Sequence, residues 1–141
     1  MKPTGGDVAA FVAAVTPAVR RRDAETMIAM MSEVSGREPV LWGTIVGFGS
    51  YHYRYPTGTE GDVPLLGFSP RRQATTVYLL DPRDSAAPDL SKLGPHTTGA
   101  SCVYLKDLAD IDLDVLRAAL TQSLARLTSG AVDYAEITVT G

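Results

Sequence analysis

The residues with the most chemical potential lie together between positions 42 and 55, in the segment WGTIVGFGSYHYRY. His52 and Arg54 alternate there with tyrosines, and arginine offers a planar fork that suits a carboxylate or a phosphate. Tyrosine hydroxyls, including that of Tyr53, could bind the same ligand, and Trp42 could form a pocket wall or part of the core. The segment therefore indicates a candidate site for a small molecule or an anion.

Alternation along this segment separates its side chains into two faces. Residues two apart on a strand share a face, so the tyrosines lie with the glycines, and His52 lies with Arg54. In a functional interpretation, the tyrosine hydroxyls or the His52–Arg54 pair bind a ligand. In a structural interpretation, which we favour, the tyrosines pack beneath helices with their hydroxyls at the rim, while His52 and Arg54 face water. Gly47 and Gly49 fit both, since glycine also permits a bulge or a close crossing.

Two further segments carry groups that could bind anions. Arg71 and Arg72 lie in a predicted turn, where Arg71 could clamp an anion beside Arg54. The segment 93–101, LGPHTTGAS, contains His96, two glycines and hydroxyl residues, and its backbone N–H groups could cradle an anion. It lacks the GxxxxGK[ST] pattern of a P-loop. A solvated turn and a plain connecting loop are the alternatives, and we favour them.

The acidic and nucleophilic residues give little support to metal binding or catalysis. The densest group of acids falls where a predicted helix begins, and negative charge is favoured there by capping and by the helix dipole. This group comprises Asp107, Asp110, Asp112 and Asp114. Cys102 lies in a predicted strand, where a thiol is more often part of the core. No GxSxG, HExxH or CxxC motif is present, so we favour a non-enzymatic protein without a metal site.

Hydrophobic periodicity predicts the elements that position these residues. Apolar residues at helical spacing predict a helix from about residue 8, a break at Thr16-Pro17 and a second helix. Asp23 is a plausible N-cap of the second helix, Ser35-Gly36 ends it, and its methionines form a buried stripe. Period two then predicts a long strand over 42–55, bent at Gly47 or Gly49.

Further strands are predicted over 63–69, 75–80 and 101–105, with loops over 56–62 and 81–88 and a helical turn over 88–93. A last helix is predicted over 112–128 and stops at Gly130, and residues 132–139 form a short strand or an ordered tail. The fold class is therefore α+β. We expect a mostly antiparallel sheet of about four to five strands, covered by two N-terminal helices and one C-terminal helix.

Length and composition bound the class of protein. The chain has 141 residues and is expected to form one domain over 1–141. The net charge of −3 argues against nucleic-acid binding, which needs a concentrated basic surface. No apolar run approaches the roughly 20 residues of a transmembrane helix, and no secretory signal opens the chain. With a single cysteine, which fits a reducing compartment, we expect a cytoplasmic protein without a membrane partner.

Motifs spread along the chain resemble those of a known family. They are Trp42-Gly43, Ile45–Gly49, Tyr51–Tyr55, Gly67–Arg71, Tyr78-Leu79, Leu93-Gly94, His96, Thr98-Gly99, Ser101-Cys102 and the Leu108–Asp110 stretch. In this order they resemble the signature of the YdhG-like domain family, a family of unknown function, over about residues 7–127. The resemblance implies an α+β fold often compared with frataxin. It also implies iron as an alternative ligand, because some members of the wider family are described as frataxin-like iron chaperones.

One departure from this family concerns the segment 93–101. Relatives that are typical of the family carry lysines there, whereas this chain has Pro95, Thr97 and Ala100 in their place. The departure argues against anion binding by that loop. Three functions stay open: a non-enzymatic binding module for a small or anionic ligand, a frataxin-like iron chaperone, and a protein–protein interaction module.

Overall fold

The computed structural model describes residues 2–79, 88–130, 132 and 134–141. In chain order the elements of these residues are α1 (Val8–Ala13), α2 (Ala18–Ser35), β1 (Pro39–Trp42), β2 (Ile45–Phe48), β3 (Tyr51–Arg54), β4 (Glu60–Val63), β5 (Leu66–Pro70), β6 (Thr75–Tyr78), β7 (Thr97–Thr98), β8 (Cys102–Leu105), the 3-10 helix η1 (Leu108–Asp110), α3 (Leu113–Ser129) and β9 (Glu136–Val139). The predicted loop over 81–88 lies outside the described residues except for its last position.

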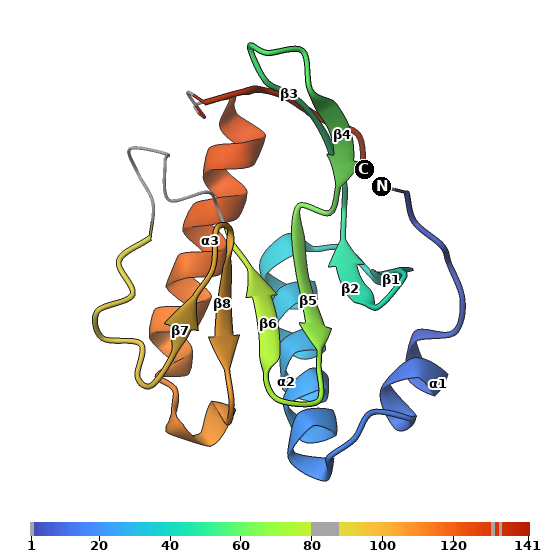
Figure 1. Ribbon diagram of the computed structural model, residues 1–141, viewed down its shortest axis with the longest axis vertical. Helices are drawn as coiled ribbons and strands as arrows, with labels where there is room; N and C mark the ends of the chain where they lie inside the picture. Colours follow the sequence, from blue (N-terminus) through green and yellow to red (C-terminus); the bar gives the residue numbers. More distant parts are fainter. Residues whose placement is uncertain (1, 80–87, 131, 133) are drawn as a thin grey trace.

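A six-stranded antiparallel sheet forms the centre of the fold, with the strand order β1-β2-β5-β6-β8-β7 (Figure 1). The helices α2 and α3 lie on one face of this sheet and contact each other, and α1 packs at the β1 edge. A smaller antiparallel sheet has the order β4-β3-β9 and packs against the C-terminal part of α3. The predicted α+β class is confirmed, although the predicted four to five strands are too few.

The long strand predicted over 42–55 is wrong, because the structure divides this segment among three strands. β1 turns into β2 at Gly43, and after Gly49 the chain leaves the six-stranded sheet to form β3 in the smaller sheet. Both glycines have a φ of 68°, in the left-handed region that glycine enters without a steric penalty. As a result, His52 and the tyrosines of β3 belong to a different sheet from Trp42.

The predicted helix ends at Gly36, Asp112 and Gly130 are confirmed. α2 ends at Gly36, where φ is 67°, and α3 ends at Gly130, where φ is 73°. The Asp112 carboxylate caps α3, since it accepts hydrogen bonds from the N–H groups of Asp114 and Val115. These residues act locally, within a turn of their own position, which is why the pattern alone identifies them.

The N-cap predicted at Asp23 is wrong. α2 begins at Ala18, directly after Pro17, and so carries Asp23 inside the helix, where its side chain is fully buried. Pro17 fits this position because its fixed φ is compatible with a helix start. The methionine stripe on the same helix does pack in the core, as its spacing predicted.

Smaller differences concern strand boundaries. Pro64 lacks an N–H for a strand ladder, so β4 ends at Val63 and β5 starts at Leu66 instead of forming one strand over 63–69. Thr97 and Thr98 form β7 within a predicted loop. Residues 88–93 contain no helix; they form a hydrogen-bonded turn in which the Leu93 N–H donates to the Leu90 carbonyl. The predicted terminal strand exists as β9.

The core lies between the helices and one face of the six-stranded sheet. Val46, Phe68, Val77 and Val103 are paired across four adjacent strands and form a continuous buried row. They pack in one cluster with Met27 and Met31 of α2 and with Leu116 and Leu120 of α3. Because residues alternate along a strand, the neighbours of this row point to the opposite face, which the helices leave open. None of the helices in the described part of the chain combines the length and apolar character that a membrane crossing requires.

Candidate functional site

The structure separates the sequence-predicted site residues into different regions. His52 and Arg54 lie on β3 in the smaller sheet, whereas Arg71 lies in the turn between β5 and β6, at the opposite end of the molecule (Figure 1). Arg71 and His96 line the same pocket. The predicted clamp of Arg71 beside Arg54 is therefore not formed, and Arg71 is brought together with His96 instead.

His52 is engaged within the smaller sheet. Its Nδ1 lies 3.0 Å from an Asp62 carboxylate oxygen, and its Nε2 lies 2.9 Å from a Glu60 carboxylate oxygen. The hydrogen bonds to Asp62 and then to Glu60 raise the pKa of His52 above its ordinary value, because they favour the protonated ring. Arg54 stands across the ladder from Glu60 and is exposed. Both ring nitrogens are therefore engaged in a polar cluster, and His52, Arg54 and Glu60 line a shallow pocket of about 540 Å³ beside it.

Trp42 is buried beside Gly47 of β2. Trp42 is 5% exposed, and a Cβ placed on Gly47 would lie 2.7 Å from the Trp42 Cδ1. The same Cβ would lie 2.8 Å from the Pro64 side chain, which belongs to the link between the two sheets. Gly47 therefore lets the indole and Pro64 lie directly on the sheet, and Trp42 belongs to the packing, not to either of the pockets described next.

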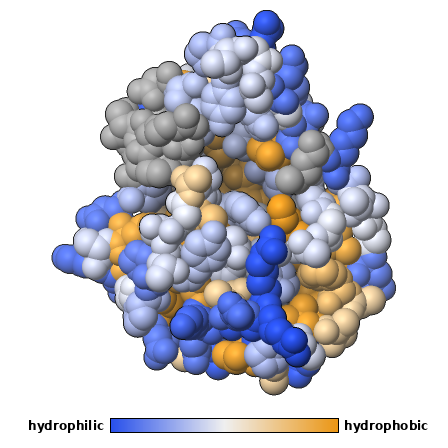
Figure 2. Space-filling model, viewed as in Figure 1, coloured by the Kyte–Doolittle hydropathy of each residue, from blue (hydrophilic) through white to orange (hydrophobic). Residues whose placement is uncertain are grey.

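A pocket of about 790 Å³ opens beside the β5–β6 turn, and we call it the basic pocket. It is lined by Arg71, Arg72, Gln73, Ala74, Thr76, Pro95, His96, Thr97, Tyr104, Lys106, Asp107 and Asp110. The cations come from two elements, since the two arginines lie in the β5–β6 turn and Lys106 follows β8. Figure 2 shows strongly hydrophilic side chains gathered over this turn. No ion pair with a carboxylate in the described ranges holds Arg71, Arg72 or Lys106.

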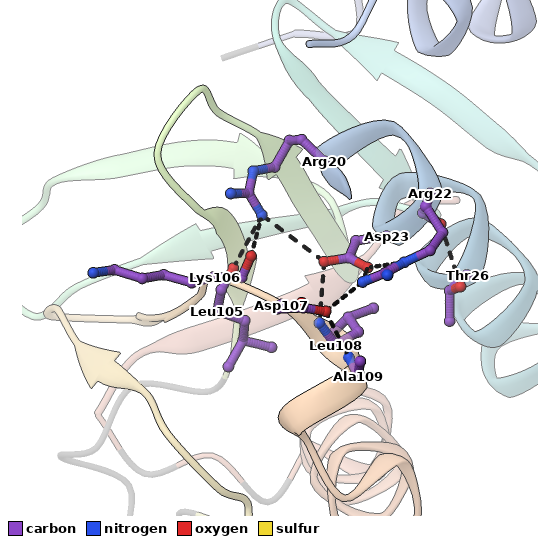
Figure 3. Close-up of polar contacts among 9 residues, drawn as sticks. All are labelled: Arg20, Arg22, Asp23, Thr26, Leu105, Lys106, Asp107, Leu108 and Ala109. Atoms are coloured by element: carbon purple, nitrogen blue, oxygen red, sulfur yellow. Dashed lines mark hydrogen bonds and ion pairs between the residues drawn. The ribbon is translucent and has the colours of Figure 1, made fainter. Parts of the chain in front are cut away.

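One of the two acids of the basic pocket is neutralised by an arginine of α2. Asp107 pairs with Arg22 and also accepts a hydrogen bond from the Ala109 N–H at 2.9 Å (Figure 3). The hydrogen bond from Ala109, followed by that from Arg22, lowers the pKa of Asp107, so this carboxylate stays ionised and engaged. The second acid, Asp110, is exposed, so among the described residues three cations face one unengaged carboxylate in the basic pocket.

A buried ionic network fixes the end of β8 that carries this wall of the basic pocket. Asp23 accepts hydrogen bonds from Arg22 at 2.8 Å and 3.1 Å and from the Leu108 N–H at 3.1 Å (Figure 3). The Arg20 Nη1 lies 3.8 Å from Asp23 and donates to the Lys106 carbonyl at 2.8 Å. Because α2 holds the backbone on both sides of Asp107, the Lys106 side chain points away from the network (Figure 3).

Thr76 is the polar group that the fold itself leaves unsatisfied in the basic pocket. The residue is 3% exposed, and its hydroxyl has no hydrogen-bond partner in the described part of the chain. Buried polar atoms nearly always have a partner, because an unpaired one costs about 1–3 kcal/mol. Thr76 lines the basic pocket, but its hydroxyl oxygen is closed to solvent, so a ligand atom would reach it only after the side chain rotates.

Tyr104 and His96 provide two further polar groups beside Thr76. Tyr104 stands directly across from Thr76 on β8, and its hydroxyl accepts from the Cys102 thiol at 3.2 Å. The bond with Cys102 raises the pKa of Tyr104, Tyr78 raises it further, and Arg71 opposes the shift, so the phenol keeps its proton as a donor. The His96 Nδ1 donates to the Gly94 carbonyl at 2.7 Å. In a neutral ring the other nitrogen, Nε2, is then a hydrogen-bond acceptor.

A second pocket of about 270 Å³ lies between the two sheets, and we call it the tyrosine cavity. Its lining includes five of the six tyrosines of the chain, together with Ile45, Val63, Pro64, Leu65, Leu79, Ser101, Leu127 and Ile137; the tyrosines are Tyr51, Tyr53, Tyr55, Tyr78 and Tyr134. The Tyr53 and Tyr55 rings are 5.2 Å apart and tilted by 55°, and Tyr55 lies 6.3 Å from Tyr134. Figure 2 shows an apolar hollow below the smaller sheet, in the region of this cavity.

Sequence reasoning identified Arg71, Arg72 and His96 but did not identify Thr76, Tyr104 or Lys106. Those three residues become neighbours through the β6–β8 register and the end of β8, which single-sequence patterns do not give. Alternation could have shown that Thr76 and Tyr104 each lie on the face opposite a buried valine. It could not have shown that the two residues are paired.

Metal ligands do not gather in the described part of the chain: no group of three or more histidine, cysteine, aspartate or glutamate residues is placed to hold an ion. No protein-family model, curated protein or solved structure matches the chain.

Proposed function

We propose that this protein is a non-enzymatic binding module for a small anionic ligand, and that the ligand lies in the basic pocket. The observation that carries the proposal is that Arg71, Arg72 and Lys106 line one pocket while no described carboxylate holds them, beside the unpartnered hydroxyl of Thr76. A phosphate or carboxylate oxygen there would accept a hydrogen bond from Thr76 once that side chain rotates, while the arginines balance its charge.

The charge balance of the basic pocket supports an anion over a cation. Arg71, Arg72 and Lys106 are not paired with a described carboxylate, whereas Asp107 is neutralised by Arg22. Arginine suits this role, because its fork can donate two parallel hydrogen bonds to one phosphate or carboxylate. The neutral Tyr104 phenol adds a donor on the same wall.

The test is a thermal-shift titration of the intact chain with sodium phosphate, sulfate and acetate at constant ionic strength. A ligand that binds only the folded state at 100 times its dissociation constant stabilises the protein by about 2.7 kcal/mol. We expect at least one anion to raise the melting temperature. Arg71→Ala and Thr76→Val should each remove most of the shift, since one removes charge and the other removes the hydroxyl at nearly constant shape.

The matched control is Arg54→Ala, which removes the same charge from an exposed position in the other sheet. The control should keep the full ligand-induced shift. The proposal fails if no anion changes the melting temperature at millimolar concentration, or if Arg54→Ala and Arg71→Ala weaken binding equally. Equal weakening would mean that net charge, not the basic pocket, attracts the anion.

Membership of the YdhG-like family is also a proposal, which rests on the sequence motifs alone. The frataxin-like iron-chaperone function rests on the same resemblance, and no contact among the described residues favours it over anion binding. Anaerobic calorimetry with ferrous iron separates the two functions, because an iron chaperone should bind the metal without added anion.

A further inference from the structure

The basic pocket and the tyrosine cavity open on the same face of the six-stranded sheet. Thr76 and Tyr78 are two residues apart on β6 and therefore point to the same side. Thr76 lines the basic pocket and Tyr78 lines the tyrosine cavity. Across the ladder, Tyr104 stands opposite Thr76, and Cys102 stands opposite Tyr78. This is the face that the helices leave open.

The distance between the two pockets is short on the scale of a small molecule. Two residues along a strand span about 6.6–6.8 Å, which is about the length of one aromatic ring with its substituent. Tyr104 lines the basic pocket, and its hydroxyl lies 3.2 Å from the Sγ of Cys102, the residue that stands opposite Tyr78. A ligand group that lies beside Thr76 needs to extend by about one ring to reach Tyr78.

The basic pocket alone is much larger than a simple anion requires. Its volume of about 790 Å³ falls within the range of roughly 300–1,000 Å³ that is typical of sites for drug-sized ligands. Inorganic phosphate would occupy a small part of it and would leave the wall formed by Tyr104 and Pro95 without a contact. The size therefore indicates an organic anion.

The tyrosine cavity sets the chemistry of the organic part. Its described lining holds tyrosines, aliphatic side chains and one serine, and no charged residue. Aromatic rings attract another ring in stacked or edge-to-face geometry by about 0.5–1.5 kcal/mol beyond the burial of area. A dry cavity of about 150 Å³ can hold benzene, so a volume of about 270 Å³ has room for an uncharged ring.

From these observations we infer that the ligand is an aryl phosphate or an aryl carboxylate bound across both pockets. Its anionic group lies against Arg71, Arg72 and Thr76, and its uncharged ring passes Tyr104 and Tyr78 into the tyrosine cavity. This inference rests on the proposed anion-binding function and adds the class of ligand to it.

The test is isothermal titration calorimetry of the intact chain with matched probes. Methyl phosphate and phenyl phosphate share the anionic group and differ in the ring, and acetate and benzoate make the same comparison for a carboxylate. We expect the better aryl anion to bind about two- to tenfold more tightly than its methyl counterpart, since stacking of about 0.5–1.5 kcal/mol corresponds to about that range. The comparison of the two pairs shows whether the anionic group is a phosphate or a carboxylate.

Variants assign each half of the ligand to its pocket. Tyr78→Leu and Tyr55→Leu should each reduce the preference for the aryl probe toward onefold while methyl phosphate or acetate binds as before. Arg71→Ala should weaken the aryl and methyl probes by the same factor. Two tyrosine variants are used because Tyr78 lies within a central strand and Tyr55 follows the end of β3, so a folding defect in one leaves the other informative.

The outcomes separate the inference from the proposed function. If aryl and methyl anions bind equally, the inference is overturned and the anion-binding function stands. If no anion binds at all, both are overturned. If phenol binds as tightly as the aryl anions and Arg71→Ala does not affect its binding, the tyrosine cavity is a separate site, and a ligand that spans both pockets is overturned.

Discussion

Replacing Asp23 tests the ionic network that holds α2 to the end of β8. Asp23 is fully buried and accepts from the Leu108 N–H at 3.1 Å, while its other oxygen takes two bonds from Arg22. Arg20, whose side chain is 4% exposed, has its Nη1 3.8 Å from the same carboxylate. Asp23→Ala therefore leaves a buried guanidinium without its counter-charge and a buried N–H without its acceptor.

The expected cost follows from these two losses. Removal of one partner of a buried ion pair costs about 3–5 kcal/mol, and an orphaned buried donor costs about 1–3 kcal/mol. The losses do not add fully, because Arg20 keeps its hydrogen bond to the Lys106 carbonyl at 2.8 Å. We expect Asp23→Ala to lower the free energy of unfolding by about 4 kcal/mol. Asp23→Asn should cost less, since it keeps the shape and one acceptor.

Urea unfolding followed by circular dichroism measures this loss. With a slope of about 2 kcal/mol per molar urea, the expected cost corresponds to a fall of about 2 M in the midpoint. Asp107→Ala is the matched control, because its pair with Arg22 is largely exposed and exposed pairs contribute little. A loss below about 1 kcal/mol for Asp23→Ala, or an equal loss for the control, would refute the argument.

Three further predictions concern single residues. His52→Gln should lower the melting temperature more at about pH 5.5 than at about pH 8.5. Asp62 and Glu60 raise the pKa of His52 in the folded state. The stabilisation by His52 is therefore complete below its unfolded-state pKa and is lost as pH rises through its folded-state pKa. An equal loss at both pH values would contradict this sign. Gly47→Ala should cost about 2 kcal/mol in urea unfolding, because its Cβ would lie 2.7 Å from the Trp42 Cδ1. An unchanged midpoint would show that the indole moves aside freely. Asp112→Ala should cost about 1 kcal/mol by the same method, through loss of the cap of α3, whereas Asp112→Ser should restore most of it. A serine variant no better than the alanine variant would argue against capping.

Local signals in the sequence predicted the helices and their ends well. Gly36, Gly130 and Asp112 act within one turn of their own position, so their roles follow from residue type and spacing. The failure at Asp23 has a physical cause. Arg20 lies three residues before Asp23 on the same helix, but the burial of Asp23 and its bond to the Leu108 N–H arise only through tertiary packing, which has no local signature.

The candidate site could be predicted only in part, for a similar reason. Arg71 and His96 were identified by residue type, but the prediction also placed Arg71 beside Arg54. The positive φ at Gly49 sends β3 into a second sheet and so separates the two arginines. The unpartnered hydroxyl of Thr76 can be recognised only once its burial is known.

The strand β9 gives the molecule a weak point with a defined location. It is the outer strand of the smaller sheet, it pairs only with β3 among the described strands, and three of its four residues are exposed. Segments with few buried contacts open locally at a small fraction of the free energy of global unfolding. Ile137 of β9 also lines the tyrosine cavity. Local opening at β9 would therefore expose the tyrosine cavity while the six-stranded sheet, which carries the basic pocket, keeps its pairing.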